Sequence, residues 1–342
     1  MPIPNSRRRT VPIVPEAILK RHHVHEASDT RFKAAARLLQ SLWRDQHGYP
    51  VGRQDDDTRG RGRKLGSRLT PTTAQSGANF ITPEIAALVR REVAYREISA
   101  VMDTKRLYGN LLSSQALTFN MLGILKLDLK VANRVFQQMF PNLVAEVEDI
   151  WFEHSPGRGD KAFTGDHTAF DALICCLTPT GARGFIAIEV KYSEEASSPS
   201  PNITEQLDLL SLQEAFHRDS ESNELRLGRL QQLWREHLLA VSMVRGGLYG
   251  QGVFLVVAPS QNHGCQKMIA SYRRELIEGG SPAVAFESVT TEVFVDAIEQ
   301  AGAQKEATAL RERYVDFSPV DRSLFEVIQG GSTSPRRINL AA

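Results

Sequence analysis

The segments AFDALICC (residues 169–176) and GFIAIEVKY (residues 184–192), separated by the turn-forming cluster TPTG at residues 178–181, decide the fold. The second segment is almost continuously apolar, which is typical of a strand buried on both faces. Its neighbour is similarly apolar, and the Pro and Gly between them favour a tight turn. We therefore predict two adjacent strands that form an antiparallel hairpin.

Three charged residues interrupt these apolar strands. Asp171 lies in the first segment, and Glu189 and Lys191 lie two residues apart in the second, so both project from the same face of the sheet. A carboxylate inside an apolar strand is unfavourable unless it is paired or bound to a metal. The pattern therefore favours a divalent-metal site in which Asp171, Glu189 and the carbonyl of Val190 bind Mg²⁺ or, as the alternative, Mn²⁺.

Two roles are open to Lys191 in such a site. Its ammonium group would orient or activate a metal-bound water, or it would neutralise charge that develops on a phosphate. The competing interpretation is structural: Asp171 lies in water at a strand end, and Glu189 and Lys191 lie on a solvated face. Glu-X-Lys alone occurs often by chance, so the apolar flanks carry the argument for a site.

The segments around the hairpin alternate between strands and helices. Further strands are predicted at residues 146–154, 252–258 and 283–289. Helical spacing of apolar residues predicts helices at 204–217, 224–244, 265–278 and 291–301. This order predicts an α/β fold with a mixed central sheet flanked by helices.

The first 140 residues are predicted to be mainly helical, with helices at 31–46, 83–96, 113–125 and 127–139. Residues 48–77 are rich in Gly and Arg and predict a basic surface loop. That loop would be a phosphate-contacting arm or simply a solvated loop, with the second favoured. We divide the chain into a flexible lead-in (1–30), this helical region (31–140), a core of strands and helices (141–320) and a C-terminal tail (321–342).

The composition of the chain excludes some classes of protein and leaves others open. Its 342 residues include 41 basic and 40 acidic ones, and a formal net charge of +1 argues neither for nor against a nucleic-acid partner. The three cysteines lack the spacing of a zinc site, and their low, odd number suits a reducing cytoplasm. No apolar run approaches the length of about 20 residues that a membrane span needs. We therefore expect a cytoplasmic protein without a membrane partner.

An aspartate on one strand, followed after a turn by Glu-X-Lys on the next, is the signature of the PD-(D/E)XK nucleases. Phe170-Asp171 and Glu189-Val190-Lys191 resemble it. Other segments resemble a group of largely uncharacterised, restriction-endonuclease-like bacterial proteins: RLYGNLLSSQ at 106–115, FN at 119–120, AFDA at 169–172, IEVKYSE at 188–194 and QLWR at 232–235. As an ordered set over about residues 75–320 they are more specific than the core motif, and they imply a restriction-endonuclease-like core at 141–320.

The resemblance assigns roles to individual residues. Asp171 and Glu189 would be metal ligands, and Lys191 would be the catalytic lysine. Family members often place a glutamine on the helix after the third strand. Gln232 is the preferred residue here, although the helical wheel favours the neighbouring Gln231.

The sequence departs from the family pattern at two points. Phe170 stands where the pattern has a proline before the aspartate, a replacement that many members tolerate. Many members also have an acid on the helix before the sheet. The candidates here are Asp128, Glu146, Glu148 and Glu153, and the sequence does not decide among them.

The resemblance implies a Mg²⁺-dependent endonuclease that hydrolyses phosphodiester bonds in double-stranded DNA, in restriction or phage defence. A homodimer is expected, because two cuts on a duplex usually need two active sites. Two other functions remain open: a catalytically silent nucleic-acid-binding or assembly module that keeps the fold, and an unrelated enzyme whose Glu-X-Lys is accidental. The intact set of Asp171, Glu189 and Lys191 favours the nuclease, because a silent descendant would be free to lose one of them.

Overall fold

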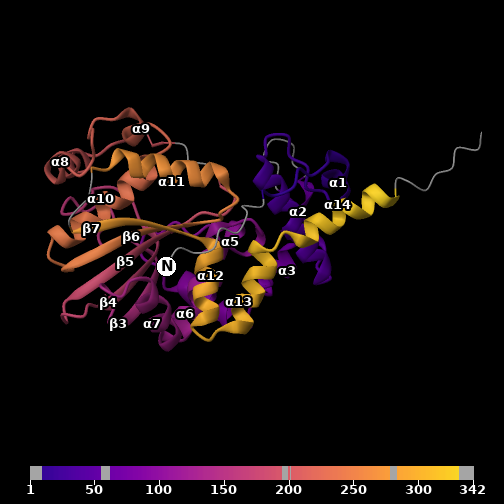
Figure 1. The fold of residues 1–342 in the computed structure, drawn as a ribbon, viewed down its shortest axis with the longest axis horizontal. Coiled ribbons are helices and arrows are strands. Elements are labelled where there is room, and N and C mark those ends of the chain that lie inside the picture. Colours follow the sequence, from indigo (N-terminus) through magenta and orange to yellow (C-terminus); the bar gives the residue numbers. More distant parts are fainter. Residues whose placement is uncertain (1–9, 55–61, 195–198, 201, 278–282, 331–342) are drawn as a thin grey trace, which may run out of the picture.

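The computed structural model describes residues 10–54, 62–194, 199–200, 202–277 and 283–330. Its central feature is a five-stranded sheet in the order β3-β4-β5-β6-β7, with helices packed on both faces (Figure 1). A smaller sheet pairs β1 (Val51–Gln54) with β2 (Arg63–Leu69). The predicted fold class, an α/β fold with a mixed central sheet and a mainly helical N-terminal region, is confirmed.

The strands of the central sheet are β3 (Glu146–His154), β4 (Phe170–Leu177), β5 (Arg183–Val190), β6 (Gln251–Ala258) and β7 (Val284–Thr290). β3, β4 and β5 pair antiparallel, whereas β5, β6 and β7 pair parallel. The predicted hairpin of β4 and β5 is confirmed, and β5 is buried from Gly184 to Val190. Helices connect the parallel strands, as crossover connections require.

The helices before the sheet are α1 (Glu16–Arg21), α2 (Arg31–Gln46), α3 (Pro71–Gln75), α4 (Pro83–Ala94), α5 (Thr104–Gly109), α6 (Ser114–Leu127) and α7 (Leu129–Met139). Those after β5 are α8 (Glu205–Glu214), α9 (Asn223–Arg226), α10 (Gln231–Arg245), α11 (His263–Glu275), α12 (Thr291–Gln300), α13 (Gln304–Leu310), a π-helical turn (Arg311–Val315) and α14 (Ser318–Gly330). The side chains of Thr30, Thr82 and Ser113 accept backbone hydrogen bonds at the starts of α2, α4 and α6. Within the described ranges, none of these helices combines the length and apolar composition of a membrane span.

The central sheet separates two hydrophobic clusters. On β4, Ala172 and Ile174 face the cluster that contains residues of α6, α7 and α12, whereas Leu173 and Cys175 face the cluster built on α8, α10 and α11. Figure 1 shows these two groups of helices on opposite sides of the sheet. Because side chains alternate along a strand, Asp171 lies on the same face as Leu173, the face that α10 covers.

The prediction of a flexible lead-in is wrong for the described residues 10–30. They include α1, and the side chains of Val11, Ile18, Leu19 and Val24 are buried in the core. The six residues of α1 are too few to show a helical period, so this packing could not be predicted from the sequence. Residues 1–9 lie outside the described part of the chain.

The prediction of a surface loop at residues 48–77 is also wrong, although residues 55–61 lie outside the described part of the chain. The described residues form β1, β2 and α3, and Leu65, Ser67 and Leu69 are buried. These three residues are two apart, which is the period of a strand with one buried face, but basic residues near them obscured the pattern. A Cβ at Gly66 would lie 2.1 Å from the carbonyl oxygen of His22, so glycine is required for this packing.

Other predicted boundaries also differ from the structure. α14 extends to Gly330, so the described part of the predicted tail (321–342) is helical. The helix predicted at 224–244 is interrupted between α9 and α10. The division at residue 140 stays a prediction, but one hydrophobic cluster contains residues from both sides of it, such as Leu117 and Ile188.

Candidate active site

Three strands place carboxylates in a row across the sheet. In the β3–β4 ladder, Glu153 falls opposite Asp171, between two regular pairs. In the β4–β5 ladder, Ala172 pairs with Ile188, so Asp171 and Glu189 face each other at the next position. The register therefore brings one acid from each strand to the same level of the sheet.

The structure brings together the three charged residues of the hairpin. Glu189 is 4% exposed and Lys191 is 7% exposed, and Lys191 Nζ lies 2.6 Å from Glu189 Oε1. Asp171 Oδ2 accepts a hydrogen bond from the backbone N–H of Val190 at 2.8 Å. Burial, followed by the charges of Glu189 and Glu153, raises the pKa of Asp171 well above its ordinary value. The interpretation that Glu189 and Lys191 lie on a solvated face is therefore wrong.

Gln232 on α10 connects the members of this cluster. Its Oε1 accepts a hydrogen bond from Lys191 Nζ at 2.7 Å, and its Nε2 donates to Glu189 Oε1 at 2.7 Å and to Glu236 Oε1 at 2.8 Å. Gln231 instead exchanges hydrogen bonds with the backbone of Ser200. The structure thus places Gln232, and not Gln231, at the cluster.

Glu236 belongs to the cluster and was missed by the sequence analysis. It is 3% exposed, and its Oε2 has no hydrogen-bond partner among the described residues. Burial, followed by the charge of Glu189, raises the pKa of Glu236 well above its ordinary value. Its spacing of four residues from Gln232, which puts both side chains on one face of α10, is the signal that would have found it.

Among the four acids that the sequence left open, Glu153 is the one in the row. Asp128 caps the N-terminus of α7, and Glu146 and Glu148 are exposed in the first half of β3. The backbone of Glu153 has a φ of 49°, which is uncommon for a residue other than glycine. Burial, assisted by the charge of Glu189, raises the pKa of Glu153 to about 7.

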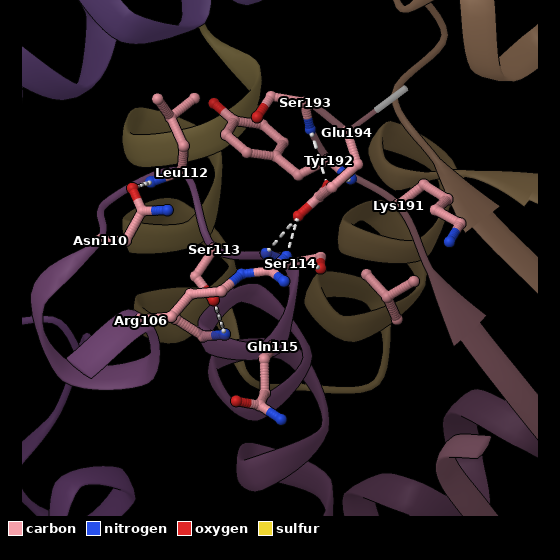
Figure 2. A network of polar contacts seen from close by, with 12 residues as sticks. Arg106, Asn110, Leu112, Ser113, Ser114, Gln115, Lys191, Tyr192, Ser193 and Glu194 are labelled. Atoms are coloured by element: carbon pink, nitrogen blue, oxygen red, sulfur yellow. Dashed lines mark hydrogen bonds and ion pairs between the residues drawn. The ribbon is translucent and has the colours of Figure 1, made fainter. Parts of the chain in front are cut away.

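A second polar network joins the end of β5 to the N-terminus of α6 (Figure 2). The carboxylate of Glu194 accepts hydrogen bonds from the Arg106 side chain at 2.7 Å and from the backbone N–H of Ser114 at 3.1 Å. It also accepts one from the backbone N–H of Tyr192 at 3.0 Å. In Figure 2 the side chain of Lys191 points away from this carboxylate. The network therefore fixes the turn after β5 without engaging the lysine.

The same end of α6 also reaches the row of carboxylates. The side chain of Gln115 donates a hydrogen bond to Glu153 and lies 3.4 Å from the carbonyl oxygen of Val101. Residues 106–115, one of the stretches that carry the family resemblance, thus support both the turn after β5 and the row itself.

The cluster has more acidic groups than basic ones, a composition that suits a cation. The carboxylates of Glu153, Asp171, Glu189 and Glu236 act on one another, and Lys191 supplies a single positive charge among them. In the described ranges, no group of three or more His, Cys, Asp or Glu side chains forms a ready-made metal site. Mg²⁺ does not require one, because it is usually bound by one or two carboxylates together with water and substrate phosphates. Asp171 and Glu189 therefore fit the donor set of a hard divalent cation.

Comparison with known proteins agrees with this geometry. A family model described as the PD-(D/E)XK nuclease superfamily matches residues 27–316, which include all five strands of the central sheet. No curated protein and no solved structure matches the chain significantly. The match spans Asp171, Glu189 and Lys191 on the hairpin and Gln232 on α10. The motif on the β4–β5 hairpin, the mixed central sheet and the family model agree, and the chain belongs to the PD-(D/E)XK nuclease superfamily.

Proposed function

We propose that this chain is a metal-dependent endonuclease that hydrolyses phosphodiester bonds in double-stranded DNA. The observation that carries the proposal is a buried lysine in contact with a buried glutamate at 2.6 Å, inside a cluster with an excess of carboxylates. Such a cluster is unfavourable without a further cation. A divalent metal would balance the negative charge of the carboxylates. A phosphate group of the substrate would balance the positive charge of the metal and the lysine.

The proposed roles follow from the contacts of each side chain. Asp171 and Glu189, with the carbonyl oxygen of Val190, would hold Mg²⁺ or, as the alternative, Mn²⁺. The metal supplies Lewis-acid polarisation of the phosphate when it is bound. Lys191 Nζ, held at 2.6 Å by Glu189 and at 2.7 Å by Gln232, would stabilise the charge that develops on the phosphate or orient the attacking water. Gln232 would act as a positioning residue.

Duplex DNA as the substrate, a role in restriction or phage defence, and a homodimer that cuts both strands are proposed by analogy with the family. The competing proposal is a catalytically silent nucleic-acid-binding or assembly module. The connected cluster of Asp171, Glu189, Lys191 and Gln232 argues against it, because a module that only binds has no need of buried, interacting charges.

Cleavage of supercoiled plasmid and linear duplex DNA tests the proposal. We expect cutting in Mg²⁺ or Mn²⁺ and none in EDTA. Lys191→Ala should lower the rate by at least about 100-fold, because the ammonium group that stabilises the charge developing on the phosphate is removed. Asp171→Ala and Glu189→Ala should act similarly, because each removes a proposed metal ligand. Lys267→Ala, which removes an exposed lysine of α11, is the matched control and should cut at the wild-type rate.

Circular dichroism must first show that each variant keeps its fold, because each loses an ionisable side chain of the cluster. If two of the three folded variants cut at the wild-type rate, the proposed site is wrong. Cutting that persists in EDTA would exclude metal dependence. DNA binding without cutting under any metal condition would favour the silent module.

A further inference from the structure

A pocket of about 320 Å³ lies at the edge strand β3, where the end of α4 and the segment after it pack against the strand. Its wall includes Tyr95, Arg96, Met102, Trp151, Phe152 and His154. This volume is at the lower end of the range for small-ligand sites. Three of these six side chains are aromatic and a fourth is an imidazole ring, so the pocket is suited to a planar group.

Exposed apolar side chains concentrate beside this pocket. Among the described residues, four large hydrophobic side chains are more than 70% exposed: Ile13 at 73%, Tyr95 at 84%, Ile98 at 92% and Val101 at 74%. Three of the four fall within seven consecutive residues. Such a concentration of apolar side chains on a solvent-exposed surface is characteristic of a binding site.

The rings at the strand are held in place by their own contacts. Trp151 Nε1 donates a hydrogen bond to Asp149 at 2.8 Å, and the rings of Trp151 and His154 meet at 4.7 Å with an interplanar angle of 65°. The Nδ1 of His154 bonds the carboxylate of Glu97. The rings on the strand side of the pocket are therefore positioned by other side chains, whereas the side chain of Tyr95 is exposed to solvent.

The acids at the pocket wall already have hydrogen-bond or ion-pair partners. Glu97 pairs with His154 and with Arg158, whose Nε lies at 3.2 Å, and Glu92 lies 3.6 Å from Lys126. Their charges are therefore partly balanced and do not exclude a nucleic acid from this surface. Their oxygens remain suitable acceptors for the amino groups at the edge of a base.

The pocket adjoins the row of carboxylates along β3. Phe152 and His154, which line the pocket, flank Glu153, which belongs to the row. Gln115 links the row to the segment that contributes Met102 to the pocket, because its side chain contacts both Glu153 and the carbonyl oxygen of Val101. A phosphate bound at the row would therefore lie next to strand residues that line the pocket.

We propose that this pocket binds one unpaired base of the nucleic-acid strand that the enzyme cuts. The inference rests on the proposed function and narrows its substrate: DNA with an unpaired or extruded base beside the scissile phosphate is bound in preference to a fully paired duplex. Aromatic rings stack on any base, so the contact selects for the unpaired state rather than for sequence.

Binding of a fluorescein-labelled, single-stranded oligonucleotide in EDTA tests the inference without cleavage. Tyr95→Ala should weaken binding by about 5- to 100-fold, because one stacking contact is lost. Tyr95→Phe keeps the ring and should bind like the wild type. Phe325→Ala removes an aromatic side chain of α14 that is 64% exposed, and this control should leave binding unchanged.

Replacing single bases by abasic sites then locates the contact. In the wild type, one abasic position beside the cleavage site should weaken binding as Tyr95→Ala does, and in Tyr95→Ala that position should have no further effect. If Tyr95→Ala binds and cuts like the wild type, the inference is wrong while the proposed function stands. If the wild type neither binds nor cuts nucleic acid, the proposed function fails and the inference fails with it.

Discussion

At the scale of single residues, Glu153 shows how the site departs from an arrangement optimised for stability. Its backbone has a positive φ of 49°, and its carboxyl group is largely buried near Asp171 and Glu189. Burial and the charge of Glu189 raise the pKa of Glu153 to about 7. The metal-free protein is therefore destabilised at and above neutral pH by groups that a cation would stabilise, which is common where residues serve function.

We predict that Glu153→Gln stabilises the metal-free protein at pH 8 by up to roughly 3 kcal/mol. The folded-state pKa of about 7 exceeds the ordinary value of 4.5, so the folded state binds more protons between these pH values, and the free energy of unfolding falls as pH rises. Glutamine does not ionise, so the gain should disappear below pH 4.5. Denaturant unfolding in EDTA, at pH 8 and below pH 4.5, measures this gain in the free energy of unfolding.

Glu148→Gln is the matched control for that prediction, because it removes an exposed glutamate from the same strand. It should change the free energy of unfolding little at either pH. An equal gain for Glu153→Gln at both pH values would mean that the gain comes from packing and not from ionisation.

At the scale of secondary-structure elements, the hairpin was the most predictable part of the fold. The apolar segments and the turn cluster predicted the pairing of β4 with β5, and alternation put Glu189 and Lys191 on one face. These rules hold because they depend on the local backbone alone. The choice between Gln231 and Gln232 could not be made in this way, since it depends on how α10 is rotated against the sheet.

The sequence left Glu153 as one of four candidate acids and did not single out Glu236, because these acids reach the site only when separate elements meet. Glu236 becomes part of the cluster through the packing of α10, and Glu153 through the register of β3. Their local sequences resemble those of ordinary surface acids. The same reasoning applies to Leu65, whose burial in β2 was hidden among basic residues.

The contact between α5 and the turn after β5 leads to a prediction about Arg106. Its side chain is 44% exposed and holds Glu194, three residues after the catalytic lysine of the proposal. Arg106→Ala should lower kcat by about 10- to 100-fold with little change in KM, because the turn that positions the lysine loosens. Glu194 keeps its backbone donors, so the fold should be retained. Cleavage kinetics over a range of DNA concentrations separate the two constants.

Two further variants sharpen this prediction. Arg106→Lys keeps the positive charge and should recover part of the lost kcat. Arg90→Ala removes another exposed arginine, which bonds backbone carbonyls near α3, and should leave both constants unchanged. A rise in KM with kcat unchanged would contradict the positioning role and indicate instead that Arg106 contacts the substrate.

At the scale of the whole molecule, one hydrophobic cluster joins the helical region to the sheet. It extends along the chain from Val11 to Val320 and includes Ile188 and Val190, which flank Glu189 on the opposite face of β5. The family model begins only at residue 27, so the segment before it contributes to the core without belonging to the matched region. Strand β5 is therefore supported by residues from both ends of the described chain.

This continuity predicts that the segment before residue 27 unfolds together with the rest of the protein. Ile18, which is 1% exposed, and Ile13, which is 73% exposed, form a matched pair of isoleucines in that segment. Ile18→Ala should lower the free energy of unfolding by about 2–5 kcal/mol, because it leaves a cavity in the core. Ile13→Ala should change it by no more than about 0.5 kcal/mol. Circular dichroism and tryptophan fluorescence should report the same shifted transition for Ile18→Ala, as expected for one cooperative unit. Equal stability of the two variants would mean that the segment is attached loosely after all, and that the core begins with α2.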